Sequence, residues 1–167
     1  MEEQEAGEGE ARQLAGAYLR RAYENQMRGD LEEAIANYKK SIDIFPTAEA
    51  YTFLGWTYSF QGRYDDAIEE CKKAIALDPE FGNPWNDIGA YFIEKGELHR
   101  APSYLMRATQ AKRYDSRCFP WANLARIWER LGARFQALEC YQKALAENPD
   151  YAAAQAARRR LGTGINN

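Results

Sequence analysis

YTFLGWTYSFQGRYDDAIEECKKAIALDP, residues 51–79, has the pattern of two amphipathic helices joined by a glycine. Before and after Gly62, apolar residues recur at steps of three and four, which brings them onto one face of a helix. Gly62 can adopt the left-handed backbone conformation that ends a helix, and Pro79 cannot continue one. The stretch therefore predicts a helical hairpin.

The same pattern recurs four times along the chain of 167 residues. Each copy carries a glycine with an alanine five positions later: GDLEEA (29–34), GRYDDA (62–67), GELHRA (96–101) and GARFQA (132–137). A larger apolar residue stands two positions after the glycine in the first three copies and three positions after it in the last. The glycines at 29, 62, 96 and 132 are 33, 34 and 36 residues apart. Regular repeats of this length are typical of a solenoid, in which each unit buries its apolar face by stacking on its neighbours.

The repeats resemble the tetratricopeptide repeat family, whose pattern is aromatic, Leu-Gly, aromatic, then Ala, aromatic and Pro. Matching residues are Tyr18, Ala22, Ala34, Tyr38 and Pro46 in repeat one; Tyr51, Leu54, Gly55, Tyr58, Ala67 and Pro79 in repeat two; Trp85, Ile88, Gly89, Phe92, Ala101 and Ala108 in repeat three; and Trp121, Leu124, Ala125, Trp128, Ala137, Tyr141 and Pro149 in repeat four. The resemblance implies an all-α, right-handed superhelical solenoid of four helical hairpins plus a C-terminal capping helix.

Small residues mark the points where paired helices are expected to cross. They are Ala22, Gly55, Gly89 and Ala125 on the first helices and Ala34, Ala67, Ala101 and Ala137 on the second helices. A larger side chain at such a crossing would push the two helices apart.

These signals predict one domain over residues 11–161, with repeats at about 15–47, 48–81, 82–117 and 118–151 and a capping helix over 151–161. Residues 1–10, rich in Glu and Gly, are expected to form a disordered acidic tail, and residues 162–167 a flexible one. The third repeat is longer and lacks its closing proline, with AKRYDSRC (111–118) instead. A tolerated surface insertion is one interpretation; a basic contact through Lys112, Arg113 and Arg117 is the other.

Charge argues against a nucleic-acid partner. The net charge is −3, and the glutamates of the first ten residues contribute −5 of it, which leaves about +2 for the remainder. A general nucleic-acid binder needs a concentrated basic face, which a nearly neutral body lacks.

The cysteines and the N-terminus favour a cytoplasmic location. Cys71, Cys118 and Cys140 cannot all pair, and none has metal-ligand spacing. The opening MEEQEAGEGE is acidic where a secretion signal would be basic and then apolar. No apolar run approaches the length needed to cross a bilayer, so we expect no membrane insertion.

Nothing in the sequence marks a catalytic centre. The only histidine is His99, and no nucleophile and orienting acid are marked around it. Phosphate-binding, dinucleotide-binding and HExxH motifs are absent. We therefore expect a non-enzymatic protein without cofactor or metal.

The face of each first helix opposite its core stripe is the candidate binding surface. In the family that this chain resembles, such faces line a concave groove that holds an extended peptide or a helix of a partner protein. The expected partner-binding residues are Arg20, Tyr23, Phe53, Trp56, Phe60, Asn86, Asp87, Asn123, Arg126 and Arg130.

Phe53, Trp56 and Phe60 lie on the side of their helix that should be polar. Contiguous exposed apolar surface marks interaction sites. The alternative is that Trp56 and Phe60 pack sideways against Tyr23 and Met27. Asn86 and Asn123 form a polar half, because an amide both donates to and accepts from a peptide backbone.

Two alternative functions remain open. The chain could be a self-associating scaffold that forms homo-oligomers through its aromatic face or stack ends. It could also resemble small bacterial secretion chaperones, which hold an apolar export substrate. Another branch of the family clamps acidic chaperone tails with lysines and asparagines. In this chain Leu19, Tyr23 and Phe53 occupy positions where that clamp has lysine or asparagine, so we do not expect binding of chaperone tails.

Overall fold

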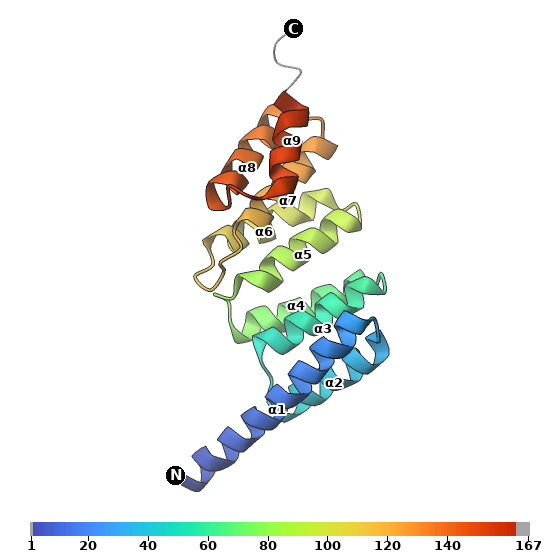
Figure 1. Cartoon of the computed structure of the whole chain (residues 1–167), viewed down its shortest axis with the longest axis vertical. Coiled ribbons are helices and arrows are strands. Elements are labelled where there is room, and N and C mark those ends of the chain that lie inside the picture. The colour runs from blue at the N-terminus through green and yellow to red at the C-terminus, as the bar shows by residue number, and fades with distance from the viewer. Residues whose placement is uncertain (1, 163–167) are drawn as a thin grey trace. The chain divides into compact units, whose positions relative to one another are not determined.

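The computed structural model describes residues 2–162, and the side chains from Gly7 onward. Within that range the chain is all-α (Figure 1). Its elements are α1 (Glu2–Arg28), α2 (Leu31–Ile44), α3 (Ala48–Phe60), α4 (Tyr64–Leu77), α5 (Gly82–Glu94), the 3₁₀ turn η1 (Leu98–Arg100), α6 (Ala101–Gln110), α7 (Cys118–Arg130), α8 (Arg134–Glu147) and α9 (Ala152–Gly162). The expected all-α fold of four helical hairpins and a final helix is confirmed.

The chain divides into two compact units, Met1–Pro79 (unit 1) and Glu80–Asn167 (unit 2). In unit 1, α1 pairs with α2 and α3 with α4, while α2 and α1 both contact α3. In unit 2, α5 pairs with α6 and α7 with α8, and α9 packs on α8. The prediction of a single domain over residues 11–161 stays a prediction.

Glycine ends the first helix of every hairpin. Gly29, Gly62, Gly96 and Gly132 have φ angles of 87°, 72°, 77° and 73°. Side chains with a Cβ rarely adopt this left-handed conformation, whereas glycine does so without steric cost. The periodic glycines that revealed the repeats therefore act as the turns between paired helices.

The helix crossings are as close as the small residues predict. A Cβ on Gly55 would lie 2.8 Å from the carbonyl oxygen of Ala67 on α4. A Cβ on Gly89 would lie 2.4 Å from Leu105 Cδ2 on α6. The facing alanines, among them Ala67 and Ala101, are completely buried.

Each hairpin also holds the first aromatic residue of its repeat pattern under a basic side chain from its own second helix. The charged atom lies 4.8–5.8 Å from the ring centroid, where a cation is attracted to the face of the ring. The four pairs are Lys40 with Tyr18, Lys73 with Tyr51, Arg107 with Trp85, and Lys143 with Trp121. This contact repeats with the hairpins and is part of their packing.

The N-terminal segment differs from the disordered tail expected over residues 1–10. Helix α1 begins at Glu2, so residues 2–10 belong to it. Arg12 lies 3.6 Å from Glu8, one turn away on the same helix. The predicted cap is present as α9, with Ala154 and Ala157 buried. The flexible tail expected over residues 162–167 lies outside the described residues except for Gly162, which ends α9.

The three cysteines are reduced and buried. No helix in the described part of the chain is long and apolar enough to cross a membrane. Among residues 7–162, no cluster of His, Cys, Asp or Glu could hold a metal ion.

Candidate functional site

Four aromatic side chains form a continuous row on unit 1. Tyr23 of α1 contacts Phe53 of α3 with ring centroids 5.8 Å apart, Phe53 contacts Trp56 at 6.4 Å, and Trp56 contacts Phe60 at 5.2 Å. Residues 53, 56 and 60 recur at helical steps of three and four, which places them on one face of α3. We call these four residues the aromatic row.

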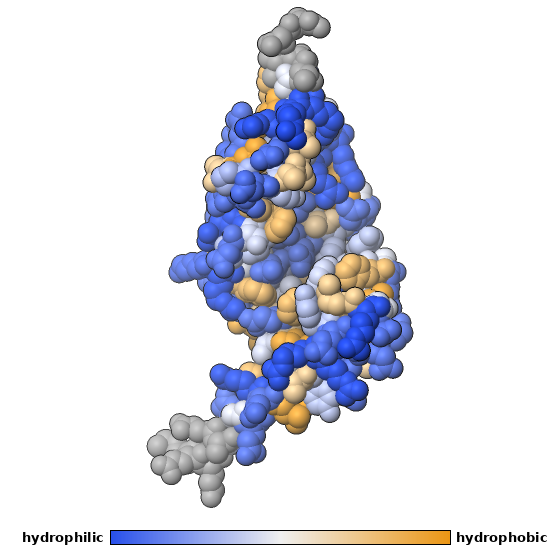
Figure 2. Space-filling model, in the orientation of Figure 1, coloured by the Kyte–Doolittle hydropathy of each residue, from blue (hydrophilic) through white to orange (hydrophobic). Residues whose placement is uncertain are grey.

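The aromatic row is partly exposed. Tyr23 is 42% and Phe60 53% exposed, and the neighbouring Met27 is 62% exposed. Phe53 and Trp56 between them are half-buried. The rings thus pack sideways against one another while their outer edges face solvent. Figure 2 shows apolar surface over α3, beside the C-terminal end of α1.

A shallow pocket of about 330 Å³ opens at the Tyr23 end of the row. Its lining residues are Leu19, Arg20, Tyr23, Glu24 and Phe53. The pocket places Arg20 and Glu24 beside the aromatic rings, so both an apolar and a charged group of a ligand would find a partner here.

A buried hydrogen-bond network fixes the position of the row. The Oε1 atom of Gln26 accepts from the Tyr38 hydroxyl at 2.7 Å and from the Thr57 hydroxyl at 3.0 Å, which ties α1 to both α2 and α3. Phe53 stacks on Tyr38 at 6.2 Å. Burial raises the pKa of Tyr38, which therefore stays a neutral donor. The sequence analysis missed Gln26, because a lone glutamine among surface-type residues carries no periodic signal.

Unit 2 presents a polar row instead. Asn86 of α5 accepts from the side-chain amide of Asn123 on α7 at 3.1 Å, and Asn123 accepts from Arg126 at 3.1 Å. Arg126 also pairs with Glu94 at 2.8 Å. Arg130 donates to the backbone carbonyl of Ile93 at 2.7 Å. The expected polar residues of α5 and α7 are thus brought together, and Glu94 joins them.

Asp87 is the exception in this polar row, because no cation accompanies it. Its side chain is half-buried and accepts only a long hydrogen bond of 3.4 Å, from Asn86. Burial raises the pKa of its carboxyl group to about 7, and the Asn86 contact opposes this only in part. Within the described residues no basic side chain forms an ion pair with it.

The segment inserted in the third repeat is packed onto α5 and is more than a surface loop. Tyr114 is buried, and its ring occupies the space where a Cβ of Gly82 would stand, 2.4 Å away. The backbone pairs there too: the Arg113 amide donates to the Glu80 carbonyl at 2.9 Å, and the Gly82 amide to the Arg113 carbonyl at 3.1 Å. Neither contact was expected, because a single tyrosine in a loop gives no pattern.

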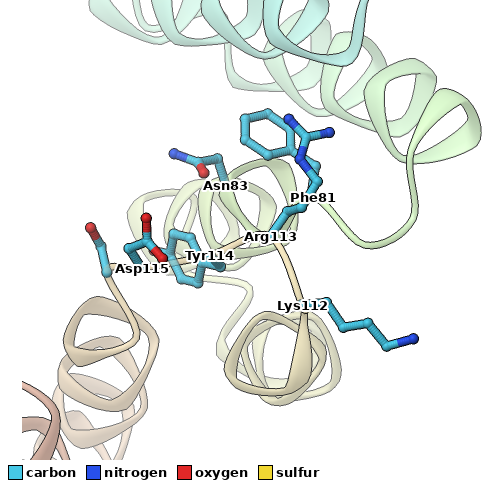
Figure 3. A pocket seen from close by; sticks show the side chains of 7 residues that line it. Phe81, Asn83, Lys112, Arg113, Tyr114 and Asp115 are labelled. Atoms are coloured by element: carbon cyan, nitrogen blue, oxygen red, sulfur yellow. The ribbon is translucent and has the colours of Figure 1, made fainter.

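This insertion walls a pocket of about 460 Å³ on unit 2 (Figure 3). Phe81, Asn83, Lys112, Arg113, Tyr114, Asp115 and Ser116 line it. The Arg113 guanidinium lies 5.0 Å from the Phe81 ring centroid, and the Lys112 side chain points away from the other labelled groups. Arg117 donates to the Ala111 carbonyl at 2.9 Å. The three basic residues therefore do not converge on one point.

The structure groups the expected site residues into two sets. Unit 1 brings together Arg20, Tyr23, Phe53, Trp56 and Phe60; unit 2 brings together Asn86, Asp87, Asn123 and Arg126, with Arg130 at the end of the same helix. A groove continuous through both sets stays a prediction.

Comparison with known proteins is consistent with the repeats. The tetratricopeptide repeat family matches residues 15–47, 48–81 and 118–151, together more than half of the chain. The type IV pilus assembly protein PilF of Pseudomonas aeruginosa is 28% identical over 133 residues, which are 79% of this chain and 53% of PilF. Anaphase-promoting complex subunit 3 of Schizosaccharomyces pombe is 26% identical over 113 residues, 67% of this chain and 17% of that protein.

Solved structures match as well. The structure of P. aeruginosa PilF superposes with a TM-score of 0.83 at 26% identity, over 93% of this chain and 69% of that one. A MamA crystal structure superposes with a TM-score of 0.73 at 25% identity, over 90% and 82% of the two chains. This chain spans about half of the length of the curated PilF sequence.

Proposed function

Because the chain belongs to the tetratricopeptide repeat family, we propose that it is a non-enzymatic protein-binding module whose anchor site is the aromatic row of unit 1. Tetratricopeptide repeat proteins mediate protein–protein interactions. The observation that carries the proposal is the row itself: four contiguous rings on α1 and α3, of which the two end rings, Tyr23 and Phe60, are about half exposed.

The row offers enough surface for specific binding. Covering an exposed large apolar side chain contributes about 1.5–3 kcal/mol before the costs of ordering. Tyr23 and Phe60 are 42% and 53% exposed, so covering both would contribute about half of the full amount each, about 1.5–3 kcal/mol together. Micromolar affinity therefore needs further contacts beside these two rings. The favoured ligand is a peptide or helix that inserts apolar side chains at this row.

Unit 2, taken by itself, offers amide groups that suit a peptide backbone. Asn86 and Asn123 already form a hydrogen bond with each other, yet each amide has further donor and acceptor capacity. Both are half-buried, so they are fixed in place while remaining reachable. We expect these amides to orient a segment that binds to unit 2.

The relatives favour a partner that is part of a larger assembly. PilF is by its name a type IV pilus assembly protein, and the yeast relative is a subunit of the anaphase-promoting complex. We propose by analogy that the aromatic row receives a segment of one component of a multi-protein complex. Three reduced, buried cysteines are compatible with the cytoplasmic location that we propose for it.

The test is affinity capture from the source cells with a Tyr23→Ser/Phe60→Ser variant. These two rings are the exposed ends of the row, so their loss leaves the Phe53–Tyr38 stacking intact. Phe135→Ser is the matched control, since Phe135 is 73% exposed but lies on α8 of unit 2. Circular dichroism checks that each variant is folded.

We expect the double variant to lose a partner that wild type and Phe135→Ser both retain. The proposal fails if all three proteins capture the same partners. Self-association through the same row is a separate outcome, recognised by a molecular mass that rises with protein concentration for wild type and not for the double variant.

A further inference from the structure

α1 and α3 lie side by side in unit 1 and run in the same direction (Figure 1). Tyr23 of α1 contacts Phe53 of α3, and one turn later Gln26 of α1 accepts a hydrogen bond from Thr57 of α3. Because successive contacts advance along both helices together, the outer faces of this pair form one surface. The aromatic row and Met27 are its apolar part.

Both faces carry side chains at alternating intervals of three and four residues. On α1 the positions are 20, 23 and 27, and on α3 they are 53, 56 and 60. These intervals keep side chains in line along a helix, and they are the intervals at which helices pack into one another's grooves. The surface is uncovered at Tyr23, Met27 and Phe60, so its periodicity fits the apolar stripe of another helix.

An extended ligand would find few partners for its backbone on this surface. Each of its residues brings an N–H and a C=O group, and each group needs a hydrogen bond once it is covered. The backbone groups along α1 and α3 are bonded within their own helices. The pocket of about 330 Å³ is lined by Leu19, Arg20, Tyr23, Glu24 and Phe53, none of which carries an amide side chain. A bound helix bonds its own backbone and needs no such partners.

Arg20 is the unpaired charge at the pocket end of this surface. Its neighbour Glu24 lies 4.0 Å from Arg28, one turn further along α1. Among residues 7–162, no acidic side chain forms an ion pair with Arg20, which lines the pocket and is exposed. Glu49, the one charged residue of α3, has an interaction of its own. The charge that complements this end of the surface is therefore an acidic one.

We propose that the aromatic row receives an amphipathic α-helix of the partner protein. Its large apolar residues recur at intervals of three and four, and an acidic residue within one turn of the first or last of them pairs with Arg20. The inference rests on the proposed function and adds the conformation and the charge of the ligand. One apolar side chain of the helix enters the pocket beside Tyr23 and Phe53, and the others lie along Trp56 and Phe60.

The helical conformation and the acid contribute unequally to affinity. An exposed ion pair is weak because water and salt screen both charges, so removal of the acid should weaken binding by about two- to fivefold. A ligand that cannot form a helix presents its anchors out of line with the row and leaves covered backbone groups without hydrogen bonds. Its binding should be weaker by at least about tenfold.

The experiment uses the full chain and three capped, alanine-rich peptides of about four helical turns. The first has three leucines at intervals of three and four, with a glutamate one turn before the first leucine and one turn after the last. Either direction of binding then brings an acid to Arg20. In the second peptide, glutamine replaces both glutamates. In the third, proline replaces two alanines between the leucines, which prevents a helix and keeps every anchor and charge.

Binding is followed through the indole N–H resonance of Trp56, which Trp56→Phe identifies among those of the four tryptophans. We expect saturable shifts with the first peptide, weaker binding of the glutamine peptide and the weakest binding of the proline peptide. A proline peptide that binds as tightly as the first overturns the inference in favour of an extended ligand. Absence of a saturable shift with all three peptides up to about a millimolar also overturns it.

Two variants test the role of Arg20. Arg20→Gln should abolish the preference for glutamate over glutamine, whereas Arg21→Gln should keep it, because Arg21 is an exposed arginine of α1 that lines neither this pocket nor the one around Leu14. Equal binding of both peptides to wild type, or a preference that survives Arg20→Gln, overturns the inference.

The proposed function is judged by a different result. Capture with Tyr23→Ser/Phe60→Ser asks whether a partner needs the row at all, whatever conformation that partner has. A partner lost from this variant upholds the row even when the peptides show that its ligand is not an acidic helix.

Discussion

Gly16 and Gly55 are both glycines in the middle of a helix, but their surroundings differ. A Cβ on Gly16 would touch only the end of the flexible Arg20 side chain at 3.6 Å, whereas a Cβ on Gly55 would press on the backbone carbonyl of Ala67 at 2.8 Å. The Ala67 backbone belongs to α4 and cannot yield without moving the helix. The sequence pattern alone distinguished these two glycines, since only Gly55 stands at a repeat position.

We therefore predict opposite effects of two chemically identical substitutions. Gly16→Ala should raise the free energy of unfolding by about 0.5–1 kcal/mol, because alanine favours the helix. Gly55→Ala should lower it by about 1–3 kcal/mol through overpacking. Urea unfolding monitored by circular dichroism measures both, and a Gly55→Ala protein as stable as wild type would contradict the close crossing of α3 and α4.

Asp87 yields a prediction about stability and pH. Its folded-state pKa of about 7 lies above the ordinary value, so the folded protein holds this proton more tightly than the unfolded chain does. Stability from this group is therefore greatest at acid pH and is lost as the pH rises toward 7. Asp87→Asn avoids this loss. The variant should be more stable than wild type by about 1–3 kcal/mol near pH 8, and by less near pH 5.

The measurement is urea unfolding of wild type and Asp87→Asn at the two pH values, with Asp150→Asn as the control for the change in net charge. A variant less stable than wild type near pH 8 would mean that the Asp87 carboxylate has a favourable partner.

At the scale of the elements, the turn glycines make the hairpins. Gly62 joins α3 to α4 with φ of 72°, and no atom outside its neighbours would touch an added Cβ. Gly62→Ala should therefore lower the free energy of unfolding by about 1–2 kcal/mol, because alanine is strained in the left-handed conformation and not because its Cβ meets another atom. Asparagine tolerates the left-handed region better than alanine, so Gly62→Asn should lose less. Thermal unfolding monitored by circular dichroism ranks the stability of the two variants. Equal losses of stability for Gly62→Ala and Gly62→Asn would argue against the left-handed turn.

Periodic elements could be predicted from the sequence, and single contacts could not. The spacing of Gly29, Gly62, Gly96 and Gly132 predicts all four turns, because each repeat imposes the same backbone geometry. Pro102 is the second residue of α6, in the first helical turn where a missing backbone N–H costs no hydrogen bond. Tyr114 was not identified as a packing residue, since its partner is the bare Cα of Gly82, a contact that leaves no trace in hydrophobic periodicity.

In the fourth repeat the apolar residue after the turn glycine is shifted by one position, and the structure shows how this shift changes the packing. Its apolar residue stands one position later than in the other copies, and Phe135 is accordingly exposed, whereas Leu31, Tyr64 and Leu98 are half-buried. A shift of one residue turns a side chain by 100° around a helix, enough to move it off the packed face. Arg134 takes the inner position and donates to the backbone carbonyl of Leu161, which ties α8 to the end of α9.

At the scale of the whole molecule, the two units carry faces of different chemistry. Unit 1 offers apolar rings, and unit 2 offers amides and an unpaired acid. The sequence predicted which residues belong to each set because first helices repeat in phase, so opposite faces can be read from periodicity. It could not predict that Arg126 and Arg130 are satisfied within the protein while Asp87 is not, because that depends on contacts between helices.

The central claim is that the exposed end of the aromatic row contacts a partner protein. The most direct measurement places a photo-crosslinking phenylalanine analogue at position 60 or, as the control, at position 135, and irradiates the source cells. Both positions hold an exposed phenylalanine, so neither substitution should disturb packing. We predict a discrete crosslinked partner from position 60 that is absent from position 135. Identical patterns from the two positions, or no adduct from position 60 while position 135 gives one, would contradict the account.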